Sequence, residues 1–147
     1  MGGWNRAIAF EFNKRMDIKL FEQDLFNIFN SINFSKIHKL EFQKLQGAIN
    51  KDDEYEFKIA LNHNKCISDL ALCFIGFISI KEEIGSSALL VGDTKDSDDF
   101  IEQNRKEIIE KLDLKHKSKI NRAVYSHCYE LEEVEDLLSS EGQEVLL

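Results

Sequence analysis

The loop from Asp93 to Asp99 holds the closest group of residues that could bind a metal ion. Its sequence is Asp-Thr-Lys-Asp-Ser-Asp-Asp, and carboxylate oxygens are the ligands that calcium and magnesium prefer. The loop lacks the central glycine and the distal glutamate of an EF-hand, so a helix N-terminus stabilised by negative charge is the simpler interpretation. If a metal does bind, we expect Asp93 and Asp96 to be its ligands.

Histidine, cysteine and serine are the other residue types that could do chemistry. The four histidines, at positions 38, 63, 116 and 127, match no zinc-binding spacing. No serine lies in a GxSxG turn, and the sequence contains no glycine-rich phosphate-binding motif. Cys128 follows His127 directly, but adjacent side chains on a strand point to opposite faces. We therefore expect no enzymatic activity and no cofactor, with an enzyme whose site is assembled from distant residues as the least favoured alternative.

The composition suits one small domain that folds without disulfides. The chain has 147 residues, of which 43% are hydrophobic and 11 are phenylalanine, enough apolar surface to offset the entropy of ordering. Its three cysteines form no metal-binding or redox pair, which favours a reducing compartment. The apolar run from Leu70 to Ile80 is too short to span a bilayer, and no signal peptide is recognisable. We expect a cytoplasmic protein that binds no membrane, and the proline-free composition is compatible with a bacterial or phage source.

Three helices are predicted in the part of the chain that precedes the acidic C-terminal segment. They are predicted over Trp4–Met16, Glu22–Asn33 and Asp98–Leu114. The first prediction depends on Ile8, Phe12 and Met16, which recur every four residues. For the intervening segment 17–21 three alternatives stay open: a continuation of the helix, a kink or a short strand. Ser97 is the expected N-cap of the third helix.

Five strands are expected between and after these helices. They are predicted over Lys39–Ile49, Tyr55–Leu61, Ala71–Ile80, Ala88–Val91 and Ile120–Tyr129. The strand over Tyr55–Leu61 is the clearest prediction, because apolar and polar residues alternate strictly along it. The strand over Ala71–Ile80 is apolar on both faces, which is typical of a central strand. The first is the hairpin partner of the second, with a bulge near Gly47, and a helix over Ser35–Ile49 is the competing interpretation. Residues 1–147 thus form one α+β domain, with a mainly antiparallel sheet of about four to five strands and helices packed largely on one face.

The last eighteen residues concentrate negative charge and contain no Lys, Arg or His. Seven carboxylates lie there, against a formal net charge of −8 for the whole chain. They are Glu130, Glu132, Glu133, Glu135, Asp136, Glu141 and Glu144. Leu131, Val134, Leu137 and Leu138 add an apolar seam at helical spacing, which predicts an acidic helix at about 130–140 that docks on the domain. The basic stretch Lys111–Arg122 offers this helix an internal partner as well.

An acidic surface of this kind accelerates association with a basic protein and disfavours acidic ones. We expect a non-enzymatic inhibitor or immunity-type protein that covers the active site of a basic toxin such as a nuclease, with the seven carboxylates replacing phosphates and Tyr125 and Tyr129 as anchors. Direct nucleic-acid binding is disfavoured by the overall charge. The alternative is a small acidic secretion-type chaperone or adaptor that acts as a homodimer.

Overall fold

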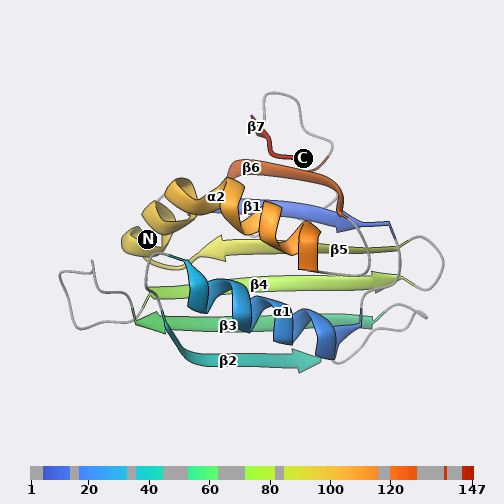
Figure 1. Ribbon diagram of the computed structural model, residues 1–147, viewed down its shortest axis with the longest axis horizontal. Coiled ribbons are helices and arrows are strands. Elements are labelled where there is room, and N and C mark those ends of the chain that lie inside the picture. The colour runs from blue at the N-terminus through green and yellow to red at the C-terminus, as the bar shows by residue number, and fades with distance from the viewer. Residues whose placement is uncertain are drawn as a thin grey trace.

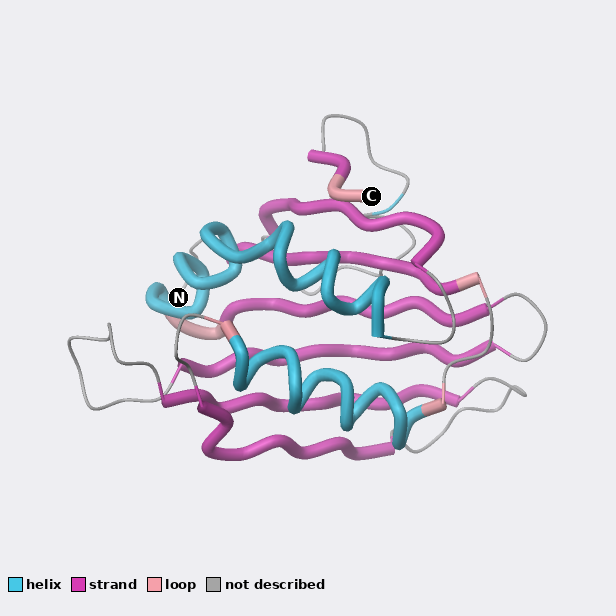
Figure 2. Tube along the Cα trace, in the orientation of Figure 1, coloured by secondary structure: helices cyan, strands magenta, loops and turns pink. Residues whose placement is uncertain are grey.

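The computed structural model describes residues 5–13, 17–32, 36–44, 53–62, 72–81, 85–115, 120–128, 138 and 144–147. Within this part of the chain, a seven-stranded antiparallel sheet carries two helices on one face (Figures 1 and 2). The strand order is β2-β3-β4-β5-β1-β6-β7. We call the covered side the helix face and the other side the second face. The predicted α+β class is confirmed, and the sheet has more strands than expected.

The elements follow one another as β1, α1, four strands, α2 and two further strands. Their bounds are β1 Asn5–Phe12, α1 Ile18–Ser31, β2 Lys36–Lys44, β3 Asp53–Asn62, β4 Leu72–Lys81, β5 Gly85–Gly92, α2 Lys95–Lys115, β6 Ile120–Cys128 and β7 Glu144–Val145. The predicted strands that correspond to β2, β3, β4, β5 and β6 are therefore confirmed in the described residues, and the competing helix over 35–49 is wrong where the structure describes it. Gly47, the expected bulge position, lies outside the described residues; the register of β2 against β3 shifts instead between Ile37 and Lys39.

The predicted N-terminal helix over Trp4–Met16 is wrong, because residues 5–12 form strand β1 between β5 and β6. A spacing of four residues is close to one helical turn, but it is also two repeats of a strand. Ile8 and Phe12 consequently share the helix face in β1, while Ala7 and Ala9 are buried toward the second face.

Helix α1 begins at Ile18, four residues before the predicted start. The Asp17 carboxylate caps it, because its Oδ1 accepts hydrogen bonds from the backbone N–H of Lys19 at 2.9 Å and Leu20 at 3.3 Å. The residues 18–21 therefore continue the helix, and Phe21 is fully buried beneath it.

Helix α2 begins at Lys95, and Thr94 rather than Ser97 caps it. Thr94 Oγ1 accepts a hydrogen bond from the Ser97 N–H at 3.1 Å. Ser97 is buried in the first turn, where its Oγ accepts from the Cys73 N–H of β4 at 2.9 Å. The predicted N-cap is wrong by one turn, because the Ser97 hydroxyl joins the helix to the sheet.

Two hydrophobic clusters lie on opposite sides of the sheet. The larger one fills the space between the sheet and the helices, and Phe21 lies within it, with its ring centroid 6.0–6.3 Å from those of Phe10, Phe12, Phe42 and Phe57. The smaller one lies on the second face and joins β1, β5 and β6 to a residue of the acidic segment. Its buried members are Ala7, Ala9, Leu89, Val91, Val124 and Leu138.

Candidate partner-binding site

Leu138 is one of the points at which the acidic C-terminal segment meets the sheet. Its side chain is 6% exposed and belongs to the cluster on the second face, together with Leu89, Val91 and Val124. A leucine buried to this extent contributes about 1.5–3 kcal/mol of hydrophobic stabilisation. Leu138 is one of the four apolar residues of the predicted seam, so the seam does supply a core contact at this position.

Most of the candidate acidic residues fall outside the part of the chain that the structure describes. This group contains Glu130, Glu132, Glu133, Glu135, Asp136, Glu141 and the aromatic candidate Tyr129. The predicted helix at 130–140 falls there too, with Leu138 as its described residue. The role of these residues in binding a partner stays a prediction. In the sequence, Asp136 stands two positions before the buried Leu138, and Glu141 stands three positions after it.

Glu144 is bound within the protein by an arginine of α2. The Arg105 Nε donates to both carboxylate oxygens of Glu144, at 3.2 Å and 3.0 Å. Glu144 belongs to the two-residue strand β7, which pairs with β6 so that Glu144 lies opposite Tyr125 and Val145 opposite Val124. One of the seven candidate carboxylates therefore already has a cation inside the protein.

Tyr125 lies on the helix face of β6, beneath the same arginine. The Arg105 guanidinium carbon is 4.8 Å from the centroid of the tyrosine ring, and the side chain is 8% exposed. Burial raises the pKa of Tyr125 above its ordinary value, with Glu102 acting in the same direction and Arg6 and Arg105 opposing it. The ring thus packs between β6 and α2, and the structure brings Tyr125 and Glu144 together around Arg105.

Arg105 was not among the candidate residues of the sequence. It stands 39 positions before Glu144, in a helix whose exposed residues include both acidic and basic ones. No local spacing connects the two residues, because their contact depends on the pairing of β7 with β6 and on the packing of α2 above β6.

In the basic stretch Lys111–Arg122, the cations that the structure describes lie beside residues other than those of the acidic segment. Lys111 Nζ lies 3.0 Å from Glu107 Oε1, one turn earlier in α2, and 2.9 Å from Ser31 Oγ at the end of α1. Arg122 faces Glu11 in the register of β1 and β6. The ion pair that the described residues show for the acidic end comes from Arg105 instead.

The two candidate metal ligands lie at the start of α2. Asp93 and Asp96 are both exposed, whereas Asp98 accepts a hydrogen bond from the backbone N–H of Arg6 at 2.8 Å. Among the described residues, no three His, Cys, Asp or Glu side chains come close enough together to hold a metal ion. Asp96 and Asp98 lie in the first turn of the helix, where negative charge is favourable.

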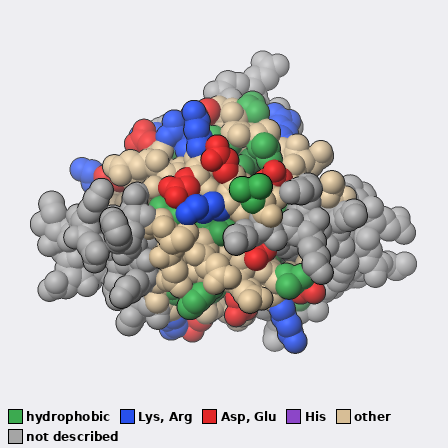
Figure 3. Space-filling view, viewed as in Figure 1, with side chains coloured by type: hydrophobic (Ala, Val, Ile, Leu, Met, Phe, Trp, Pro, Cys, Tyr) green, Lys and Arg blue, Asp and Glu red, His purple; other side chains and the backbone are tan. Residues whose placement is uncertain are grey.

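The helix face carries charges of both signs. Figure 3 shows Lys and Arg interspersed with Asp and Glu over α2 and the neighbouring surface. Arg6 and Glu102 form an ion pair there, with 4.0 Å between the Arg6 Nη2 and Glu102 Oε2 atoms. Such a pattern is typical of a solvated face that keeps a protein soluble. The helix face is therefore a poorer candidate than the acidic segment for binding a strongly basic partner.

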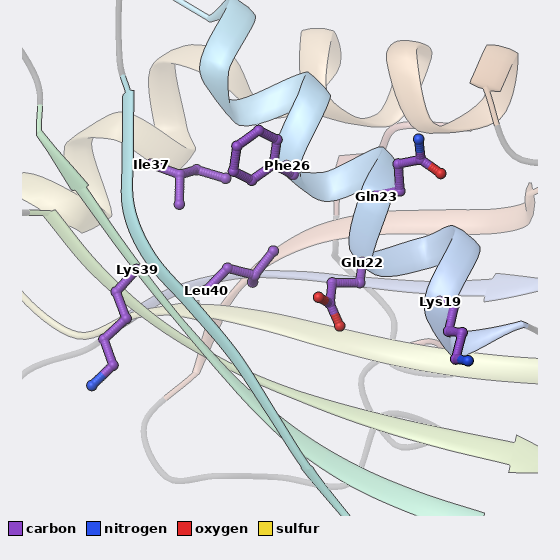
Figure 4. A pocket seen from close by; sticks show the side chains of 7 residues that line it. All are labelled: Lys19, Glu22, Gln23, Phe26, Ile37, Lys39 and Leu40. Atoms are coloured by element: carbon purple, nitrogen blue, oxygen red, sulfur yellow. The ribbon is translucent and has the colours of Figure 1, made fainter.

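A groove lies at the other end of the sheet, between α1 and the edge strand β2 (Figure 4). It has a volume of about 370 Å³. Phe26 of α1, with 47% of its surface exposed, lines it beside Ile37 and Leu40 of β2. Polar residues complete the lining; they are Lys19, Glu22, Gln23 and Lys39. This groove was not predicted from the sequence, because it depends on how α1 packs beside β2.

Comparison with known proteins adds no family to these observations. No protein-family model matches the chain, and no curated protein or solved structure is detectably similar to it. Neither helix of the described part combines the length and the apolar character that crossing a membrane requires.

Proposed function

We propose that this protein is a non-enzymatic binding protein of the inhibitor or immunity type, which blocks a basic partner in the cytoplasm. The observation that carries this proposal is the burial of Leu138 on the second face of the sheet. An acidic tail without a core contact would serve only as a solvated chain. An acidic segment that is anchored to a rigid sheet can present its carboxylates to a partner at a lower entropic cost.

The mechanism that follows is steric and electrostatic. A toxin that cleaves nucleic acid has a cationic groove for phosphates, and carboxylates presented together can occupy that groove in their place. The negative field also raises the rate of association, an effect that salt screens over about 8–10 Å at physiological ionic strength. The protein would therefore capture its partner fast at low salt and more slowly at high salt.

Charge neutralisation tests this proposal. The partner is first identified by affinity capture, and its association with the protein is then followed by stopped-flow fluorescence at several salt concentrations. We expect that replacing Glu132, Glu133 and Glu135 by Gln and Asp136 by Asn slows association at least tenfold at low salt, with unchanged thermal stability.

The matched control removes the same number of charges from exposed positions elsewhere. It replaces Glu22, Glu54 and Glu110 by Gln and Asp99 by Asn, all of which are exposed. This control should slow association much less, because those charges are distributed over the molecule. Equal rates for wild type and the C-terminal variant at low salt would refute the proposed function.

A homodimeric chaperone or adaptor is the second candidate, and one observation favours it. The sheet ends in the edge strand β2 beside a groove with an exposed phenylalanine, and such grooves accept extended or helical segments of other proteins. Binding of a client there would depend little on salt, which distinguishes this function from the first.

A further inference from the structure

The edge strand β2 has one neighbour, β3, and its other side has no strand partner within the described residues. An edge of this kind is a template for pairing with another strand, and proteins commonly block it with lysines or a bulge. β2 contains Lys36, Lys39 and Lys44 and a register shift between Ile37 and Lys39. The shift ends at Lys39, so the three residues Lys39 to Glu41 lie in a regular stretch of the edge.

Lys39 and Glu41 carry opposite charges on either side of Leu40. Because side chains alternate along a strand and Leu40 packs on the helix face, both point to the second face. Their exposed fractions are 61% and 56%, and their charged atoms lie 3.0 Å apart. Like charges at positions 39 and 41 would repel the same two charges on a second copy of the strand. Opposite charges on either side of one residue make the strand complementary to a second copy of itself in antiparallel orientation.

We propose that β2 pairs with β2 of a second copy of this chain around a two-fold axis at Leu40, which extends the sheet across a homodimer. In this register Lys39 of each copy lies opposite Glu41 of the other, and the two Leu40 residues face each other. Each Lys39 then has a glutamate along its own strand and another across the interface. The four charges form a square in which every nearest neighbour has the opposite sign.

In this dimer the groove between α1 and β2 of one copy would lie next to the same groove of the other copy, on the helix face of the extended sheet. Phe26 and Leu40 line the groove beside the edge strand, so a second copy paired to β2 would extend its wall. Burial of the exposed surface of Phe26 would then add hydrophobic stabilisation to the backbone hydrogen bonds of the paired strands. β2 and β7 are at opposite ends of the sheet, so this interface does not involve β7 and does not depend on the proposed function.

Charge reversal tests this dimer with its own controls. Sedimentation equilibrium over a wide range of concentrations is measured for wild type, Lys39→Glu, Glu41→Lys, an equimolar mixture of the two, and the double variant that carries both changes. Each single variant places like charges opposite each other twice, and we expect it to dissociate about tenfold more readily than wild type.

The mixture and the double variant restore opposite charges across the interface. In the mixture, a chain with two glutamates meets a chain with two lysines. In the double variant the two charges exchange places along the strand, so each position again faces the opposite charge on the second copy. Both should recover the dimer to within about twofold of wild type.

Two results would overturn the proposed dimer. One is a wild type that stays monomeric at millimolar concentration, and the other is a pair of single variants that dimerise as strongly as wild type.

Discussion

At the scale of single residues, Gly76 shows how the sheet makes room for its largest side chains. It lies opposite Phe57 in the register of β3 and β4. A Cβ atom built at Gly76 would come within 1.9 Å of Phe57 Cζ, so the ring occupies the space that any other residue would need. Phe57 in turn contacts Phe21 and Phe42, which prevents it from moving aside without disturbing the core.

We expect Gly76→Ala to lower the free energy of unfolding by about 1–3 kcal/mol, because the added methyl group overpacks the core. In a strand without such a ring the same change would stabilise the protein, since alanine loses less backbone entropy than glycine does. Urea denaturation of the variant measures the effect. Combining it with Phe57→Leu should recover part of the loss, and additive effects of the two changes would contradict the contact.

At the scale of elements, Ser97 connects α2 to the interior strand β4. Its hydroxyl accepts a hydrogen bond from the Cys73 N–H at 2.9 Å and lies 2.7 Å from Thr94 Oγ1. The neighbouring Asp93 N–H donates to the Cys73 carbonyl at 2.9 Å. The start of α2 is therefore attached to the sheet by polar groups of Ser97 and Asp93.

Replacing Ser97 by Ala should reduce the free energy of unfolding by about 1–3 kcal/mol, because the Cys73 N–H would lose its buried acceptor. Thr94→Ala, which removes the cap, should cost about 1 kcal/mol. Hydrogen exchange at the Cys73 amide separates the two effects: Ser97→Ala should accelerate it more than Thr94→Ala does. An unchanged exchange rate in Ser97→Ala would show that this hydrogen bond contributes little.

At the scale of the whole molecule, the sheet is covered differently on its two faces. The helix face is closed by α1 and α2, and Leu138 contributes to the cluster on the second face. The acidic segment is thus part of the folded domain at this residue. Its attachment joins the charge of the C-terminus to the rigid part of the protein.

We expect Leu138→Asp to weaken that attachment, because it places a charge in an apolar cluster. Limited proteolysis should then cleave the C-terminal segment faster than in wild type, while the far-ultraviolet circular dichroism of the sheet and helices is retained. Leu138→Met preserves volume and polarity and is the matched control. Equal cleavage of wild type and Leu138→Asp would show that Leu138 does not anchor the segment.

The sequence by itself determined the α+β class and most of the strands, because their patterns are local. Tyr55 to Leu61 alternate with a period of two, and the run that became β4 is apolar on both faces, so each segment reports its own structure. The same local information was ambiguous over residues 8 to 12. A spacing of four fits a helix and a strand alike, and only the positions of β5 and β6 on either side decided for a strand.

The candidate site depended on the tertiary structure to a greater extent. The charge of the C-terminus and its apolar seam could be recognised from the sequence, and Leu138 is buried as that seam requires. Three features could not be recognised there: the pairing of Glu144 with Arg105, the burial of Tyr125 and the place of β2 at the end of the described strand order. Each depends on residues that are distant in the chain. Periodicity determines which face of an element is apolar; the packing of the elements decides which charge meets which partner.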